Sequence, residues 1–289
     1  MSLAPEGPLL TVDEVQAGLV GPPEARPVLV DVRWALGTDP AASGAAHLEA
    51  HLPGAAFLDL EAVLSDPLPG DGRGGRHPMP SLERVQEGLR AAGVRAGRPV
   101  VFYDEATGLG AARAWWVAAY YGVEGAAVLD GGLAAWAAAG LPLEGGMVTS
   151  EPGDVVLEPG GRELLDADGV QAHLAAGGQL LDARPADRFR GENEVVDPVA
   201  GHIPGALSLP ALSLVQEGGG LVDSEHVVQA LSAAGGHTDR PTAVYCGSGV
   251  QAAHLALTLE ARGVGPRPAV YVGSWSDWIS DPDRPVETG

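Results

Sequence analysis

The stretch that decides the fold lies at residues 245–253 and reads Tyr245-Cys246-Gly247-Ser248-Gly249-Val250-Gln251-Ala252-Ala253. An apolar run at residues 242–245 precedes it, as in a buried strand, and a helical pattern follows at residues 250–262. Cys246, the only cysteine among 289 residues, therefore stands between a strand and a helix start. The N–H groups of a helix start favour a thiolate over a thiol. The pattern predicts a nucleophilic cysteine, with a small buried apolar residue as the alternative.

Comparison of the sequence with itself shows an internal repeat of two copies. The first copy has a longer insert, between residues 54 and 99. The matching pairs are residues 9–19 with 164–174, 30–33 with 181–184, 51–55 with 202–206, 99–103 with 241–245, and 130–136 with 272–278. Two homologous domains follow from this repeat. We predict a first domain at residues 1–145, a linker rich in Gly, Pro and acidic residues at 146–162, and a second domain at 163–289.

Each copy alternates short apolar runs with Ala- and Leu-rich helical stretches. This alternation predicts an α/β fold in which a parallel β-sheet is flanked by helices on both faces. Thr11 and Asp166 are the predicted N-caps of the opening helix of each copy. Ligands of such folds bind at the carboxyl ends of the strands, where Cys246 is expected.

Composition limits the classes of partner. A formal charge of −21 argues against nucleic acid and against anionic membrane surfaces, because both require a basic footprint. No run of 18 apolar residues predicts a membrane span, and residues 1–10 lack a secretion-signal pattern. A single cysteine cannot form an internal disulfide, which fits a cytoplasmic protein.

The loop Cys-Gly-Ser-Gly-Val at residues 246–250 closely resembles the active-site loop of the mercaptopyruvate-type sulfurtransferases of the rhodanese superfamily, which have Thr where this chain has Gln251. The resemblance covers nearly the whole chain and implies two tandem rhodanese-like domains. It also implies transfer of a sulfane sulfur from 3-mercaptopyruvate, through a Cys246 persulfide, to cyanide or a thiol. A thioredoxin-like protein or a low-molecular-weight thiol is the expected acceptor.

The donor is expected to be a small anion, and the residues after the cysteine bear on its charge. Thiosulfate is a dianion, and thiosulfate-type relatives place basic residues directly after the cysteine. Here Gly247 and Ser248 are neutral, which favours the single carboxylate of mercaptopyruvate, with thiosulfate as the alternative. Gly247, Gly249, Val250 and Gln251 are predicted to line the substrate site, and the two glycines permit a tight backbone path.

Two further side chains are predicted to act with Cys246. The departing enolate needs a proton, which the Ser248 hydroxyl can relay, although a turn serine bonded to its own backbone is the alternative. Relatives align a histidine and an acid from the first domain with this serine. His77 matches the histidine, with an ordinary loop residue as the alternative, and Asp59 or Glu61 matches the acid approximately.

An arginine is predicted to bind the donor carboxylate. Arg188, Phe189, Arg190 and Gly191 resemble the family segment whose first arginine contacts substrate, and guanidinium groups bind carboxylates bidentately. For Arg190 we favour a solvated loop neutralised by nearby acids. Mercaptopyruvate enzymes often carry a second arginine a few residues on, whereas residues 195–198 here read Val-Val-Asp-Pro.

Asp104 and the pair His47 and His51 bear on two activities that we do not expect, catalysis by the first domain and metal binding. Asp104 occupies the position of Cys246 in the first copy, so that domain is predicted to be catalytically silent. His47 and His51 are four residues apart, as zinc ligands on a helix can be, but His51 matches His202 in the same turn, so we expect no metal. No cofactor is expected either.

Two other functions compete with sulfur transfer. A phosphatase of related fold would use Cys-x5-Arg to bind phosphate, but Ala252 stands six residues after Cys246 and no arginine follows before Arg262. A non-enzymatic carrier would be favoured by a buried, unreactive Cys246.

Overall fold

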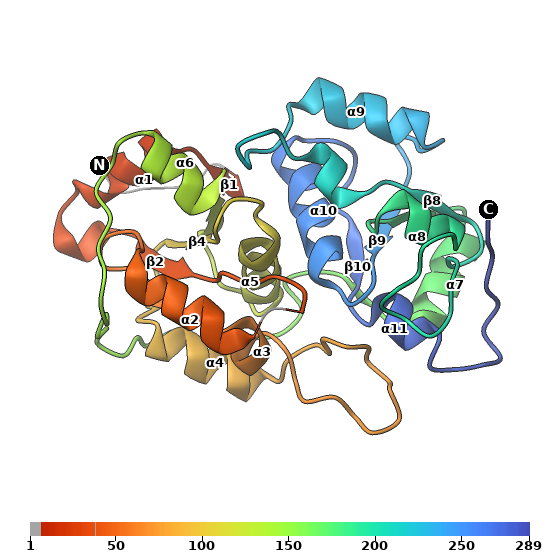
Figure 1. Cartoon of the computed structure of the whole chain (residues 1–289), viewed down its shortest axis with the longest axis horizontal. Coiled ribbons are helices and arrows are strands. Elements are labelled where there is room, and N and C mark those ends of the chain that lie inside the picture. The colour runs from red at the N-terminus through yellow and green to blue at the C-terminus, as the bar shows by residue number, and fades with distance from the viewer. Residues whose placement is uncertain (1–6, 38) are drawn as a thin grey trace. The chain divides into compact units, whose positions relative to one another are not determined.

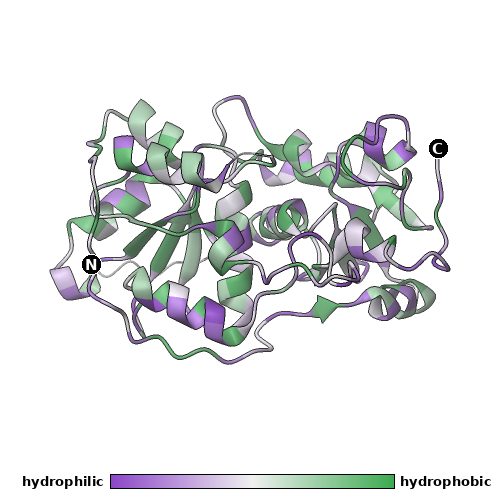
Figure 2. Cartoon of the chain, turned by 60° about the horizontal axis from the view of Figure 1, so that its bottom comes forward, coloured by the Kyte–Doolittle hydropathy of each residue, from purple (hydrophilic) through white to green (hydrophobic). Residues whose placement is uncertain are grey.

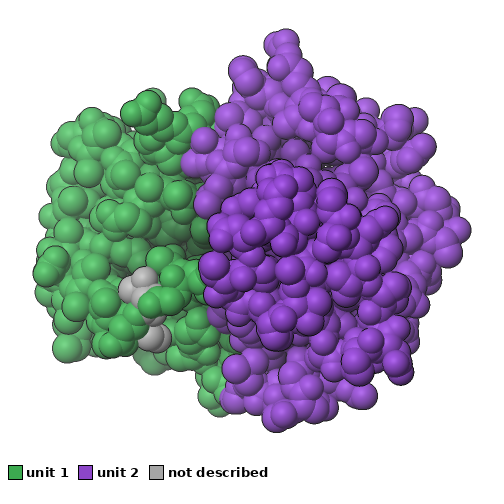
Figure 3. Space-filling model, turned by 45° about the vertical axis from the view of Figure 1, so that its right-hand side comes forward, with its two compact units in different colours: residues 1–65, 80–162, 216–221 green, residues 66–79, 163–215, 222–289 purple. Residues whose placement is uncertain are grey.

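The computed structural model describes residues 7–37 and 39–289, which form two compact units (Figure 3). The first unit runs to Ser65 and continues with Pro80–Arg162 and Gln216–Leu221. The second comprises Asp66–Met79, Glu163–Val215 and Val222–Gly289. The units therefore follow the repeat except at two segments, and the sequence between the copies, residues 146–162, packs with the first unit.

The first unit contains a five-stranded, fully parallel sheet in the order β1-β5-β4-β2-β3. Its central strand β4 is buried at all four positions, as expected for a parallel strand covered on both faces. Figure 2 shows strands of this sheet in the green of hydrophobic residues, while the surrounding helices also carry purple, hydrophilic positions. Its elements are β1 (Leu9–Leu10), α1 (Val12–Leu19), the 3-10 helix η1 (Pro23–Ala25), β2 (Val28–Asp31), α2 (Pro40–Glu49), β3 (Ala56–Phe57), α3 (Leu60–Val63), α4 (Leu82–Ala91), β4 (Val100–Tyr103), α5 (Leu109–Tyr120), β5 (Ala126–Leu129) and α6 (Gly132–Ala138) (Figure 1).

The second unit repeats this topology, with the parallel order β6-β10-β9-β7-β8. Each strand occupies the place of its counterpart five strands earlier. Its elements are β6 (Leu164–Leu165), α7 (Ala167–Ala175), β7 (Gln179–Asp182), α8 (Ala186–Arg190), β8 (Ala206–Ser208), the 3-10 helix η2 (Ala211–Leu214), α9 (Ser224–Ala233), β9 (Thr242–Tyr245), α10 (Val250–Ala261), β10 (Ala269–Tyr271) and α11 (Ser274–Trp278).

Both predicted N-caps are confirmed. The Thr11 hydroxyl accepts the Glu14 N–H at 3.3 Å, and the Glu14 carboxylate accepts the Thr11 N–H at 2.8 Å, which completes a capping box. The Asp166 carboxylate accepts the Gly169 N–H at 2.8 Å. Caps of this kind contribute about 1 kcal/mol each, so they fix where the opening helix of each unit begins.

The two cores are built from matching side chains. Tyr103 and Tyr245 end the central strands, and each hydroxyl accepts a backbone N–H, from Leu52 at 3.1 Å and from Ile203 at 3.2 Å. The predicted fold class is confirmed, and the carboxyl end of β9 carries the cysteine. None of the helices in the described part of the chain has the length and apolar character needed to cross a membrane.

Candidate active site

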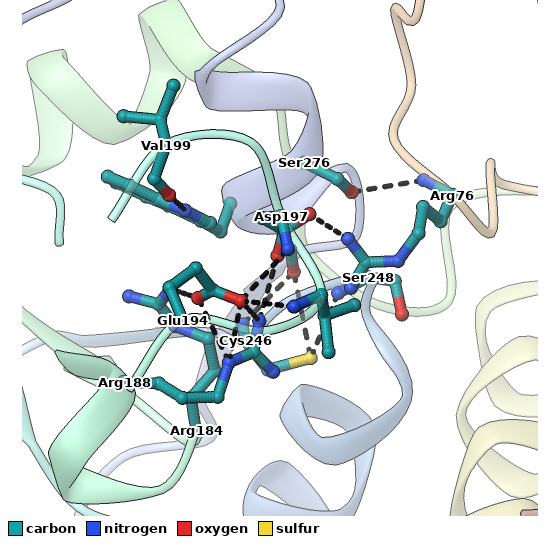
Figure 4. A network of polar contacts seen from close by, with 12 residues as sticks. Arg76, Arg184, Arg188, Glu194, Asp197, Val199, Cys246, Ser248 and Ser276 are labelled. Carbon is teal, nitrogen blue, oxygen red and sulfur yellow. Dashed lines mark hydrogen bonds and ion pairs between the residues drawn. The ribbon is translucent and has the colours of Figure 1, made fainter. Parts of the chain in front are cut away.

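Cys246 follows β9 directly, and Gly249 is the N-cap of α10, with a left-handed backbone at φ 85°. The side chain is only 2% exposed, which a structural cysteine would also show. Two backbone N–H groups nevertheless donate to Sγ, from Gly249 at 3.1 Å and from Ser248 at 3.4 Å (Figure 4). Such convergence stabilises an anion, so the geometry suits a thiolate or a persulfide.

Ser274, the first residue of α11, contacts the cysteine loop. It is the only non-glycine residue in the described chain with a left-handed φ, at 56°. Its hydroxyl accepts the Cys246 N–H at 3.0 Å, donates to the Tyr271 carbonyl at 2.8 Å and lies 3.9 Å from Sγ. We did not predict this residue from the sequence. The repeat held a signal, because Ser274 matches Gly132, which has the same φ of 56°.

The Ser248 hydroxyl is bonded to His77. Its Oγ lies 2.8 Å from His77 Nδ1, and both side chains are buried. The contact lies within one compact unit, because residues 66–79 pack with the second unit although they belong to the first copy by sequence. Ser248 is therefore not limited to bonds with its own backbone, the alternative considered above. Its hydroxyl and the imidazole are arranged as a proton relay requires.

The two acids considered beside His77 have other contacts in the first unit. Asp59 is the N-cap of α3 and accepts the Ala62 N–H at 3.1 Å. Glu61 accepts the indole N–H of Trp34 at 2.9 Å. Their part in catalysis stays a prediction.

Arg188 is buried beside the loop. Nε donates to Glu194 at 3.0 Å, and Nη2 donates to Glu194 and to Asp197, both at 2.8 Å. Burial opposes ionisation of Glu194, yet hydrogen bonds from Arg188 and two backbone N–H groups lower its pKa. Burial raises the pKa of Asp197, against the attraction of Arg76 and Arg188. These acids neutralise much of the local positive charge.

The other two arginines near Arg188 have separate roles. Arg190 is partly exposed and pairs with Glu192 at 2.6 Å, as expected for a solvated loop. Arg184 is fully buried, pairs with Asp182 at 2.6 Å and lies 4.7 Å from the ring centre of Trp275. Its partner Asp182 ends β7, so Arg184 supports the sheet.

The remaining predicted loop residues have distinct positions. Gly247 faces the guanidinium groups of Arg76 and Arg188. Val250 and Gln251 form the first turn of α10, and within the described residues neither N–H is bonded to Sγ. Substrate contact by these residues stays a prediction.

The first unit has a carboxylate in the matching position. Asp104 follows β4 and accepts the N–H groups of Ala106 at 3.1 Å, Gly108 at 2.9 Å and Gly110 at 3.1 Å. Burial raises the pKa of Asp104 to about 6, although these N–H donors act to lower it. The turn after the central strand thus directs backbone N–H groups at a side chain in both units, at the Asp104 carboxyl in the first and at Cys246 Sγ in the second.

The two histidines considered as zinc ligands have protein partners. His47 Nδ1 lies 2.9 Å from Asp31, and His51 Nδ1 lies 2.7 Å from the His47 carbonyl. Within residues 7–37 and 39–289, no group of three or more His, Cys, Asp or Glu side chains is arranged to hold a metal.

Comparison with known proteins identifies similar chains. The Rhodanese-like domain family matches residues 11–139 and 166–281. A Pseudomonas aeruginosa protein named "Probable 3-mercaptopyruvate sulfurtransferase" is 45% identical over 285 residues, covering 97% of this chain and 98% of that protein. A Mycobacterium tuberculosis protein named "Putative thiosulfate sulfurtransferase SseB" is 44% identical over 266 residues, covering 90% of each. The crystal structure of SseA from Escherichia coli, titled as a 3-mercaptopyruvate sulfotransferase, matches with a TM-score of 0.80 at 34% identity, covering 93% of this chain and 99% of that one.

Proposed function

This chain belongs to the rhodanese family, and we propose that it transfers sulfur from 3-mercaptopyruvate to a thiol or cyanide through a persulfide on Cys246. The observation that carries this proposal is the pair of N–H groups, from Ser248 and Gly249, that donate to Sγ. The names of the P. aeruginosa relative and of the E. coli structure support the choice of donor.

The first half of the reaction charges the cysteine. The Cys246 thiolate attacks the donor sulfur, an S–S bond forms and the bond from that sulfur to C3 of the donor breaks. The electron pair of the broken bond leaves as the enolate of pyruvate. The proton of the donor thiol passes to C3, and Ser248 with His77 provides the relay. The products are pyruvate and an anionic persulfide, which the loop N–H groups stabilise.

The second half returns the cysteine to its starting state. An acceptor thiolate or cyanide attacks the outer sulfur, and the S–S bond breaks to restore the Cys246 thiolate. No metal or cofactor takes part in this scheme. We propose a thioredoxin-like protein or a low-molecular-weight thiol as acceptor and the cytoplasm as compartment, since a lone cysteine that must stay reduced suits reducing conditions.

The first domain is proposed to be catalytically silent. Asp104 fills the turn that corresponds to the cysteine loop, and its carboxylate cannot accept a sulfur atom. In this proposal the domains of the repeat, residues 1–145 and 163–289, are joined by residues 146–162.

Thiosulfate is the competing donor, because the M. tuberculosis relative is named for it. Gly247 and Ser248 add no positive charge to the loop, and Glu194 and Asp197 neutralise Arg188. A dianion is therefore held less favourably than a single carboxylate.

Initial rates with the two donors, measured side by side with cyanide as acceptor, test the proposed function. We expect kcat/KM to be higher with mercaptopyruvate than with thiosulfate. Equal or better use of thiosulfate would contradict the donor assignment and leave sulfur transfer intact. Absence of thiocyanate with either donor would contradict the proposal as a whole.

A further inference from the structure

Residues 66–79 are anchored in the unit that contains Cys246. Gly74 donates its N–H to Asp277 at 2.7 Å, and Arg76 donates its N–H to Ser276 Oγ at 3.0 Å. Gly75 has φ 77°, and a β-carbon there would lie 2.2 Å from the Gly273 carbonyl oxygen. The segment therefore takes a fixed path against the start of α11, which determines where the Arg76 side chain enters.

The Arg76 guanidinium lies over the cysteine loop (Figure 4). Its Nη2 is 2.7 Å from the point that a β-carbon on Gly247 would occupy. The Nη1 and Nη2 atoms of Arg188 lie 3.8 and 3.9 Å from the same point. Two arginines far apart in sequence thus converge beside the residue that follows Cys246.

Both guanidinium groups retain hydrogen-bonding capacity at this point. Arg76 uses Nη1 to pair with Asp197, while Arg188 uses Nε and Nη2 for Glu194 and Asp197. Within the described residues, Arg76 Nη2 and Arg188 Nη1 have no hydrogen-bond partner, and Arg76 Nε is buried without one. Because Asp197 accepts from both arginines, it holds the two cations close together despite their repulsion.

We propose that Arg76 and Arg188 together bind the carboxylate of the sulfur donor, with Asp197 as the positioning residue between them. This inference rests on the proposed function. It assigns part of the specificity for the donor to residues 66–79, which lie outside the second copy of the repeat. A planar carboxylate has two oxygens and accepts from two guanidinium groups at once. A β-carbon at Gly247 would lie 2.7 Å from Arg76 Nη2, so a larger residue there would push the guanidinium group aside.

The test compares Arg76→Ala with Arg73→Ala. Arg73 belongs to the same segment, but its side chain is 83% exposed and pairs with Asp71 at 3.7 Å. Loss of charge-assisted hydrogen bonds changes affinity about 10- to 100-fold, so we expect Arg76→Ala to raise KM for mercaptopyruvate by about that factor with little change in kcat. Arg73→Ala should match the wild type.

A donor without a carboxylate gives the decisive contrast. With 1-mercaptopropan-2-one, which keeps the thiol and the ketone, Arg76→Ala and the wild type should react at equal rates. Calorimetric titration with pyruvate should show weaker binding to Arg76→Ala and unchanged binding to Arg73→Ala. Gly247→Ala keeps the arginine but crowds Nη2, and its KM should rise in the same direction.

Two results would overturn the assignment of Arg76. One is a KM and a pyruvate affinity for Arg76→Ala that match those of Arg73→Ala. The other is an equal loss of rate with both donors, which would indicate a structural role. A wild-type protein that neither uses mercaptopyruvate nor binds pyruvate would instead refute the proposed function, and this assignment with it.

Discussion

Replacing Gly249 by alanine tests whether the loop N–H groups stabilise the sulfur anion. Gly249 has φ 85°, and its N–H donates to Cys246 Sγ at 3.1 Å. For a residue with a β-carbon, this conformation costs about 1–2 kcal/mol. The loop of Gly249→Ala can relax toward negative φ, which turns the N–H away from the sulfur.

The expected effect follows from that single bond. A hydrogen bond to a charged group contributes about 1.5–3 kcal/mol, so losing it weakens the stabilisation of the sulfur anion by about tenfold or more. We expect the rate of Cys246 alkylation by iodoacetamide at neutral pH to fall by about that factor.

Gly205→Ala is the matched control. Gly205 lies in the same unit at φ 79°, is exposed, and has no atom within 4 Å of the position that a β-carbon would take. Both variants should lose similar stability in urea unfolding, about 1–2 kcal/mol, but only Gly249→Ala should be alkylated slowly. Similar destabilisation with wild-type alkylation rates in Gly249→Ala would refute the stabilisation of the anion by this N–H group.

Two more predictions concern Ser248 and Asp104. Ser248→Ala should lower kcat with mercaptopyruvate by about 100-fold or more and should change thiosulfate turnover little, because departing sulfite needs no proton on carbon; equal losses in steady-state rates with both donors would exclude the relay. Burial raises the pKa of Asp104 from 3.8 to about 6. The protonated carboxyl group therefore adds its full share to the free energy of unfolding below pH 3.8, the pKa in the unfolded chain, and this share is lost as pH rises through about 6. When the free energy of unfolding in urea is measured from acidic to neutral pH, it should fall by about 3 kcal/mol more in the wild type than in Asp104→Asn. Parallel pH dependences of the two proteins would contradict this contribution of Asp104.

The sequence allowed the fold to be predicted because the repeat and the strand-helix alternation are local patterns. The central strands β4 and β9, their tyrosines and the turns that follow them all match in the two units. Alignment of the two copies was enough to place Asp104 where the cysteine stands in the second. Backbone N–H groups donate to Asp104 in the first turn and to Cys246 Sγ in the second.

The parts of the site that depend on distant segments were not evident from local pattern. Arg76 was not predicted, because no periodicity indicates that residues 66–79 pack with the second unit. His77 was suggested only by the family resemblance, and its contact with Ser248 spans 171 positions. The family resemblance suggested a second arginine in the region of residues 195–198, where the structure shows Asp197 pairing with Arg76 and Arg188.

The most direct test is the mass of the protein after exposure to mercaptopyruvate without an acceptor. We predict a gain of one sulfur atom on the peptide containing Cys246, an equal amount of released pyruvate, and loss of the added sulfur to cyanide as thiocyanate. A Cys246→Ser protein should fold and show no gain. An unchanged mass in the wild type, or a gain that persists in Cys246→Ser, would contradict the central claim.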